Sequence, residues 1–440
     1  MKKIIIGIIV VLCVLALGAP FGSGLFMEHI VREAFGNLNT LYANRGHEVS
    51  VEIVRYDKGY ASSEIEWKIK FAGLKAVYGI DEIVFIDRAE HGWGGIISKT
   101  SLEKNAWYMD FVKNKLSGKD PLHITTNYKL AGGIGATVAV DAFSIATEDK
   151  TFTVKPGKVV VACEKDFKRF TSDATWEGMA VAENFSFGGV SLKSDLTMIS
   201  SFIWDGNIAI TLQNTQVKDG EEHFDLANMK IDYLLKYDKE HNKLSAKTEY
   251  GIDSVNLGPE NITNIFARIG VNGIDAKGYE EFMKLYSATA SAILGDITAA
   301  KDDSEKMKDV FQKKMGLVGF QIVAAGEKLL TKGLELQLSD LHAQLPEGEI
   351  KGDVTISLKR DVTFAQFVPV VNQPALALEI FALKSNLSLP EKLVGDVPML
   401  FVPIYRGMQT GLFVKNGENV LHKAETKDNK LFVNDKELVL

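Results

Sequence analysis

The chain has 440 residues, of which 46% are hydrophobic and 24% are charged. This composition is typical of globular proteins and too apolar for a disordered chain. A mean hydropathy of +0.02 excludes a polytopic membrane protein. Ten prolines and 38 glycines exclude a collagen-like chain, and two cysteines exclude a disulfide scaffold or a four-thiolate zinc site.

The N-terminus predicts a membrane anchor over residues 1–27. Lys2 and Lys3 precede Ile4 to Met27, which are 24 residues without a charge, and Glu28 ends the run. A helix of that length is about 36 Å long, enough to cross a hydrocarbon core of about 30 Å. The alternative is a cleaved signal peptide with a small-residue site at Ala16-Leu17-Gly18. The length of the run favours the retained anchor.

The lysines predict the orientation of this anchor. By the positive-inside rule they stay in the cytoplasm, so we expect residues 28–440 to form an exported body in the periplasm of a bacterium, tethered to its inner membrane. The Gly18-x-x-x-Gly22 spacing would let two anchors pack closely, which leaves a homodimer open.

The exported body is acidic. Without Lys2 and Lys3 there are 48 basic residues against 57 acidic ones, a net charge of −9 for residues 4–440. Such a surface repels phosphate backbones, and there is no basic stripe interleaved with aromatic residues. We therefore expect no nucleic-acid partner. Cys163, the one cysteine after the anchor, follows an apolar run and is predicted to be a small buried hydrophobe.

Helical spacing continues past the anchor and then changes to the period of a strand. Apolar residues recur at helical intervals from Ile30 to Tyr42, and Asn44-Arg45-Gly46 is expected to end that helix. Residues 49–53 and 65–71 then alternate between apolar and charged side chains around a turn at Asp57-Lys58-Gly59. This pattern predicts an antiparallel hairpin with one wet face.

The same alternation predicts further strands throughout the body. They are expected at 208–212, 231–237, 244–248, 334–338, 354–358, 420–425 and 431–433. Strands at this density, joined by short turns, predict an α+β fold dominated by one long antiparallel sheet. No proline-rich linker divides the body, so we expect a single elongated unit. A unit with two lobes is the alternative.

One helical block, at about residues 278–332, interrupts the strands. Tyr279 to Leu294 carry an apolar stripe of helical period. Asp302, Asp303 and Ser304 offer caps for a second, charged helix that is expected to end at Gly316, with a third helical piece from Leu317 to Lys332. We expect this block to cover one sheet face rather than to hold a cofactor.

A search for catalytic or metal-binding motifs finds none. No two of the eight histidines lie within four residues of each other, so no pair at helical spacing seeds a zinc site. Ser101-x-x-Lys104 matches a serine–lysine signature, but its companion motifs are missing, and Gly132-Gly133-Ile134-Gly135 precedes a strand-like segment rather than a helix. We therefore assign no catalytic, cofactor or metal residue.

Five short motifs, in order along the chain, resemble the YdgA-like family of bacterial envelope proteins, a domain of unknown function. They are the glycine-punctuated anchor ending at Glu28, Tyr56-x-x-Gly59-x-x-Ser62-Ser63, Glu90-His91-Gly92, Gly278-Tyr279-Glu280-Glu281-Phe282, and the terminal hairpin around Lys430 to Asp435. Relatives often carry a proline after the His-Gly pair, where this chain has Trp93-Gly94-Gly95. The resemblance implies an inner-membrane anchor and an exported body, and it implies no activity. His91 is tempting as a site, but a turn histidine beside glycine is usually structural.

Three functions follow from these patterns. A long sheet with one apolar face needs a cover, and the helical block is short for the number of strands, so an uncovered groove would bind lipid or another amphiphile in envelope maintenance. The alternative is a structural scaffold that self-associates or holds an envelope partner, through the anchor glycines and edge strands. An envelope hydrolase would need a triad or metal that the sequence does not display. We therefore expect a non-enzymatic binding protein.

Overall fold

Antiparallel sheet dominates the fold, with 56% of the chain in strands and 23% in helices. The computed structural model describes residues 27–29, 31–43, 49–71, 79–92, 95–129, 133–147, 150–164, 166–182, 184–219, 222–258, 260–300, 304–396 and 398–439. Two compact units divide the chain. The first comprises Met1–Val181, Lys193–Phe202 and Tyr286–Gly316, and the second comprises Ala182–Leu192, Ile203–Leu285 and Leu317–Leu440.

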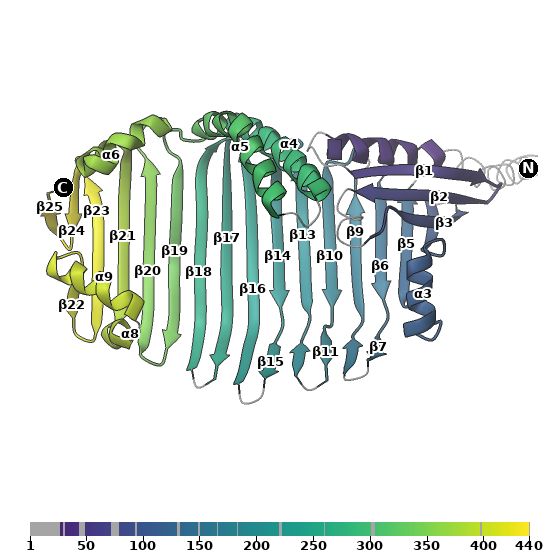
Figure 1. The fold of residues 1–440 in the computed structure, drawn as a ribbon, viewed down its shortest axis with the longest axis horizontal. Coiled ribbons are helices and arrows are strands. Elements are labelled where there is room, and N and C mark those ends of the chain that lie inside the picture. Colours follow the sequence, from purple (N-terminus) through teal and green to yellow (C-terminus); the bar gives the residue numbers. More distant parts are fainter. Residues whose placement is uncertain are drawn as a thin grey trace, which may run out of the picture. The chain divides into compact units, whose positions relative to one another are not determined.

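The first unit is a meander of antiparallel strands, labelled in Figure 1. Each strand from β1 to β6 pairs with the next, and β9 and then β10 continue the sheet beyond β6. The strands of this series are β1 (Val49–Lys58), β2 (Ser62–Phe71), β3 (Ile83–His91), β4 (Gly95–Ser101), β5 (Leu122–Lys129), β6 (Ile134–Val140), β9 (Gly157–Cys163) and β10 (Arg169–Trp176). Three short strands follow the same pattern: β8 (Thr151–Val154) pairs with β7 (Phe143–Ala146) on one side and with β11 (Met179–Val181) on the other.

An amphipathic helix over residues 27–29 and 31–43 covers one face of β1–β5. Met27 and Val31, one turn apart, pack with Ile65, Ile96 and Tyr128 in the core of the first unit. These helix side chains are at most 1% exposed, so the predicted apolar stripe is the buried one. The expected stop at Asn44-Arg45-Gly46 lies outside the described residues.

Two side-chain amides fasten helices to strand edges in the first unit. Asn39 donates a hydrogen bond to the carbonyl of Val51 and accepts one from its N–H, at 2.9 and 2.8 Å. Asn105 bonds the backbone of Val84 in the same two-way manner and precedes helix α3 (Ala106–Lys115), which the sequence patterns missed. Each amide satisfies backbone groups at a position that lacks a neighbouring strand.

The second unit is a second antiparallel meander with longer strands. Its central strands pair in the order β16–β17–β18–β19–β20–β21–β23. They are β16 (Glu222–Asp238), β17 (Lys243–Leu257), β18 (Glu260–Asp275), β19 (Glu335–Leu345), β20 (Gly348–Leu358), β21 (Phe381–Pro390) and β23 (Asn419–Lys427). The shorter strands at its margins are β12 (Phe185–Phe187), β14 (Trp204–Leu212), β15 (Thr215–Asp219), β22 (Val414–Asn416), β24 (Lys430–Val433) and β25 (Lys436–Leu438). β13 (Val190–Met198) passes from one unit to the other along the chain.

Helices pack on the ends of the strands in the second unit, all on one face. Three apolar clusters join them to the sheet. Tyr237, Leu244 and Ile274 meet the start of α4, Leu334 and Leu358 meet the segment 362–380, and Leu389 and Val420 meet Val394 and Ile404. The helices are α4 (Ala276–Ala300), α5 (Ser304–Glu327), η1 (Phe364–Phe367), α6 (Val368–Asn372), η2 (Pro374–Leu376), α7 (Ala377–Ile380), α8 (Glu391–Asp396) and α9 (Pro398–Gln409). Residues 286–300 of α4 and 304–316 of α5 belong to the first unit.

The predicted strands and the helical block are confirmed, with one correction inside the block. α5 runs without interruption from Ser304 to Glu327, so the prediction that a helix ends at Gly316 was wrong. A Cβ built at Gly316 meets no atom within 4 Å, and its φ is not positive, so this glycine fits a helix interior. Glycine alone weakens a helix by only about 1 kcal/mol and does not stop it. Asp302 and Asp303, the expected caps, lie outside the described residues.

The expected anchor also falls on residues that the structure does not describe. Apart from Met27, residues 1–27 lie outside the described ranges. None of the described helices has the length and apolar character needed to cross a bilayer.

Candidate functional site: an open apolar sheet face

The two faces of the second unit's sheet differ in chemistry. Because side chains alternate along a strand, the register assigns each residue to a face. Two rows that cross six strands from β16 to β21 lie on the face that carries the helices. They are Leu235–Ala246–Val271–Leu336–Ile356–Leu383 and Tyr233–Thr248–Ile269–Leu338–Val354–Ser385. Most of these side chains are apolar, and we call the surface that they form the open face.

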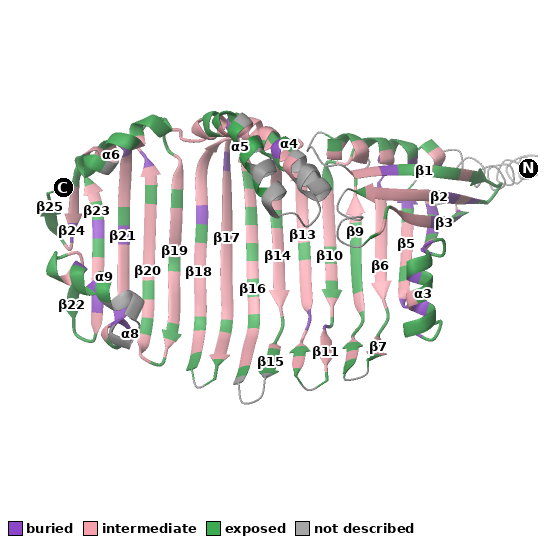
Figure 2. Cartoon of the chain, viewed as in Figure 1, coloured by how far each residue is buried: buried purple, intermediate pink, exposed green. Residues whose placement is uncertain are grey.

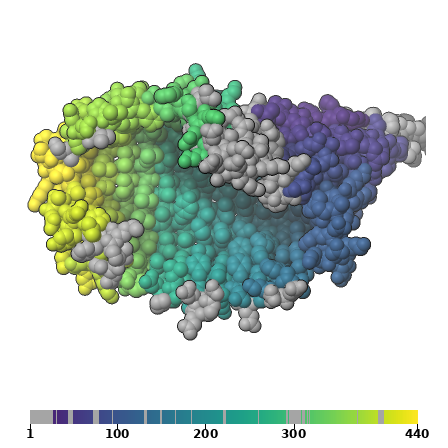
Figure 3. All heavy atoms as spheres, in the orientation of Figure 1, coloured from purple at the N-terminus to yellow at the C-terminus, as the bar shows by residue number. Residues whose placement is uncertain are grey.

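The open face is accessible to solvent in the interior of β18 and, on β19 and β20, directly beside the helix-covered strand ends. Ile269 is 48% exposed, Leu336 52% and Ile356 37%. Among the described residues of β16–β20, only Leu244, Gly270 and Leu358 are fully buried, and Leu244 and Leu358 lie at the strand ends where helices pack (Figure 2). The space-filling view in Figure 3 shows the strands around β18–β20 within a hollow of this face. The helices therefore cover the ends of the sheet and leave its centre open.

The first unit repeats this arrangement on a smaller scale. Val159 and Val161 of β9 face Val138 and Ala136 of β6 on the side to which Ile134 and Tyr128 contribute core residues. Both valines are 37% exposed, as is Val160 on the other face of β9. The N-terminal helix thus covers the strands β1–β5 and leaves β9 partly uncovered.

His91, the histidine singled out from the sequence, is buried beneath the N-terminal helix. It is 7% exposed, and its Nε2 lies 2.9 Å from the hydroxyl of Ser63, which is 5% exposed. Two motifs that the sequence presents 28 residues apart thus meet, because β2 pairs with β3. A serine hydroxyl and an imidazole at this distance are the pair that nucleophilic catalysis uses. In this conformation, however, the hydroxyl lies too deep to reach a substrate.

A second serine–histidine pair, which the sequence did not reveal, occurs in the second unit. The Ser385 hydroxyl lies 3.0 Å from His422 Nε2, and His422 Nδ1 donates to the carbonyl of Leu412 at 2.8 Å. Because a carbonyl oxygen can only accept, Nδ1 carries a hydrogen, and in the neutral imidazole Nε2 then accepts a hydrogen bond from the Ser385 hydroxyl. Ser385 is 5% exposed. Both pairs thus join neighbouring strands, and both serines are buried; Ser385 lies at the covered margin of the open face, on β21.

Beside Ser63 and His91, the first unit buries a carboxyl group. Asp87 is 3% exposed and accepts hydrogen bonds from the Trp67 indole, at 2.9 Å, and from the Thr100 hydroxyl. Burial raises the pKa of Asp87, and the bonds from Thr100 and Trp67 offset part of that rise. The Trp67 ring packs against two other rings. Its centroid lies 4.1 Å from that of Phe85 and 5.3 Å from that of Phe35, which belongs to the N-terminal helix. The carboxyl therefore orients the ring on which the helix rests.

The remaining motif residues do not assemble into a site. Ser101 donates to Glu103 at 3.1 Å, whereas Lys104 pairs with Glu66, so the serine–lysine signature brings no lysine to the serine. Cys163 is half-buried, and burial raises the pKa of its thiol to about 11. No group of three potential metal ligands occurs in the part of the chain that the structure describes.

The model of a bacterial family of unknown function, DUF945, matches residues 1–440. The match confirms the YdgA-like resemblance of the sequence motifs. No curated protein matches the chain, and no solved structure matches it.

Proposed function

Because the chain belongs to the DUF945 family, which has no assigned function, we propose its role from the geometry alone: it binds lipid or another amphiphile on the open face of the second unit. The observation that carries the proposal is the exposure of Ile269 in the interior of β18, and of Leu336 and Ile356 next to the helix-covered strand ends at Leu334 and Leu358, on a continuous apolar surface. Soluble proteins rarely expose contiguous apolar patches of more than a few hundred Å², and larger ones mark binding surfaces.

The dimensions of the open face favour a lipid chain as its occupant. β16 and β17 have 17 and 15 residues, so they extend for about 50 Å at about 3.3 Å per residue. One acyl chain spans half of a hydrocarbon core of about 30 Å. An acyl chain is therefore shorter than these strands and fits along them, beside the start of α4, which packs at one end of each.

We further propose that the protein works at the bacterial inner membrane, with residues 1–27 as anchor and the body in the periplasm. The charge-free run after Lys2 and Lys3 supports this location. An apolar binding surface tethered to a bilayer would meet lipid continually, which suits a non-enzymatic role in envelope maintenance.

The experiment is mass spectrometry of an organic extract from residues 28–440, exported with a cleavable signal peptide and purified from the periplasm without detergent. We expect about one lipid per protein. The Leu336→Ser/Ile356→Ser variant should lose most of it, since two exposed apolar contacts become polar.

Leu234→Ser is the matched control. Leu234 is 46% exposed, close to Leu336 in exposure, but it lies opposite Lys247 on the other face of the same sheet. Its variant should keep the lipid. A lipid-free wild-type body that is folded by circular dichroism would overturn the proposal and move weight to a scaffold for an envelope partner or a second copy.

A further inference from the structure

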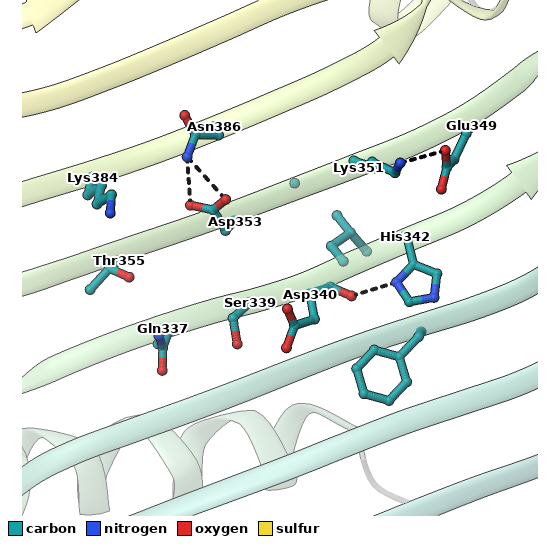
Figure 4. A pocket seen from close by; sticks show the side chains of 13 residues that line it. Gln337, Ser339, Asp340, His342, Glu349, Lys351, Asp353, Thr355, Lys384 and Asn386 are labelled. Atoms are coloured by element: carbon teal, nitrogen blue, oxygen red, sulfur yellow. Dashed lines mark hydrogen bonds and ion pairs between the residues drawn. The ribbon is translucent and has the colours of Figure 1, made fainter.

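A polar trough of about 800 Å³ lies on the face of the second unit's sheet opposite to the open face. Its lining comes from β18, β19, β20 and β21, and Figure 4 shows the side chains standing on these strands. Gln337 and Thr355 line it, and each is the chain neighbour of an open-face residue, Leu336 or Ile356. The trough is therefore a surface separate from the open face, and what binds in it is independent of lipid binding on the open face.

Two irregular strands shape the trough. The register of β19 against β20 shifts between Leu338 and Leu341, where Asp340 adopts a φ of 53°. The register of β18 against β19 shifts on both sides of Phe266. A β-bulge re-aims side chains and locally bends its strand, and positive φ is uncommon for a residue with a Cβ. Neighbouring strands that shift at the same level thus open a concavity in the sheet.

Hydrogen-bonding side chains form rows across the trough. Gln337, Thr355 and Lys384 lie side by side on β19, β20 and β21. In the next row, the Asn386 amide donates to both carboxylate oxygens of Asp353, at 3.1 Å each (Figure 4). Amide, hydroxyl, ammonium and carboxylate groups at strand spacing offer donors and acceptors in alternation.

An aromatic platform closes one end of the trough. The Phe266 ring stacks on His342 with centroids 5.5 Å apart and an interplanar angle of 22°. His342 Nδ1 donates to the carbonyl of Asp340 at 3.1 Å, which fixes the imidazole at the bulge. The Arg268 guanidinium also lies over the Phe266 ring, 5.7 Å from its centroid. The faces of the platform's rings attract cations and C–H groups alike, because the ring quadrupole is negative there.

The charges around the trough balance. Lys351 pairs with Glu349 at 2.8 Å, and Lys384 lines the same cavity as Asp353. Beside the trough, Arg268 pairs with Asp340 and with Glu249, whose other partner is Lys247. A site for a phosphate or another anion would show an excess of cations, and a cation site would show the reverse. Balanced charge with many hydrogen-bonding groups selects a neutral ligand that both donates and accepts.

We propose that the trough binds an oligosaccharide. Each sugar hydroxyl donates and accepts a hydrogen bond, as the rows of Gln337, Thr355 and Asp353 require. The apolar face of a pyranose ring fits the Phe266 platform, while its hydroxyls reach the rows beside it. The protein would then hold glycan on one face of the second unit's sheet, independently of what occupies the other face.

The test is isothermal titration calorimetry of the full chain in lipid nanodiscs with chitotetraose, cellotetraose and maltotetraose, and with inorganic phosphate. At least one tetrasaccharide should bind with a Kd of millimolar or lower. Gln337→Ala/Thr355→Ala should weaken that binding about tenfold through two lost hydrogen bonds. Phe266→Leu, which keeps an apolar side chain but removes the ring, should weaken it by a similar factor.

Lys236→Ala is the control, because Lys236 is an exposed residue of β16 on the same face, outside the trough. It should bind the tetrasaccharide as the wild type does. Three results would overturn the proposal: no tetrasaccharide binds, phosphate binds in place of sugar, or the trough variants, folded by circular dichroism, bind sugar as tightly as the wild type.

Discussion

The buried carboxyl of Asp87 gives a sharp prediction for the stability of the first unit. Asp87→Ala removes the acceptor for the Trp67 indole and the Thr100 hydroxyl, both of which stay in a buried layer. An unsatisfied buried donor costs about 1–3 kcal/mol, so the two together should lower the local free energy of unfolding by about 2–6 kcal/mol. Asp87→Asn can accept from the Trp67 indole with its amide oxygen and donate its amide N–H to the Thr100 hydroxyl oxygen, so it should cost much less.

The pH dependence of Asp87 has a definite sign. Its pKa is raised in the folded state, so the folded chain holds the proton more tightly than the unfolded chain does. Its stabilising contribution is therefore present below the unfolded pKa of about 3.9 and is lost as the pH rises through the raised folded pKa. Asp87→Asn, which has no proton to lose, should flatten this fall in stability.

Hydrogen exchange of the full chain, followed by mass spectrometry on peptides from β2, β3 and β4, measures both effects after correction for intrinsic exchange rates. Two results would refute the reasoning. One is an Asp87→Asn variant as destabilised as Asp87→Ala. The other is an Asp87→Asn variant that keeps the wild-type fall in protection as the pH rises.

Three further predictions concern other parts of the chain. Leu336→Ser/Ile356→Ser should lower the free energy of unfolding of the second unit by about 2–3 kcal/mol for the two changes together, since both side chains are already partly exposed. Ile380→Ala, at 2% exposure, should cost about 2–5 kcal/mol by itself, and urea unfolding compares the two variants. Gly273→Ala should cost more than about 1 kcal/mol in the same assay, because Gly273 has a φ of 74° and a methyl group there would overlap the Gly333 carbonyl; a neutral result would contradict the β18 geometry. Cys163, with a pKa of about 11, should react with iodoacetamide at pH 8 at least tenfold more slowly than in urea-unfolded protein, as measured by peptide mass spectrometry; equal rates would show that the thiol is not protected.

Alternation predicted the strands well because one face of each sheet is apolar and the other is wet. The hairpin around Asp57-Lys58-Gly59 and the strands 334–338 and 354–358 follow directly from that period. The break expected at Gly316 was wrong, because a single glycine does not stop a helix, and helix α3 was missed, because a short, weakly amphipathic segment carries little local signal.

The sites could not be predicted from local pattern, because they depend on register between distant segments. Ser63 and His91 meet only when β2 and β3 are paired, and Ser385 meets His422 across β21 and β23. The polar trough needs the bulge at Asp340, and its residues resemble an ordinary wet strand face in the sequence. The uncovered apolar face, by contrast, was expected from the sequence, because the helical block was short for the number of strands.

The most direct test of lipid binding is photo-crosslinking in living cells with the full chain. A diazirine amino acid replaces Leu336 on the open face or, as the matched control, Leu234 on the opposite face. After illumination and purification, mass spectrometry of the intact chain should show adducts of lipid mass at position 336 and few at position 234. Protein adducts alone at position 336, or equal lipid adducts at both positions, would contradict the proposal that the open face binds lipid.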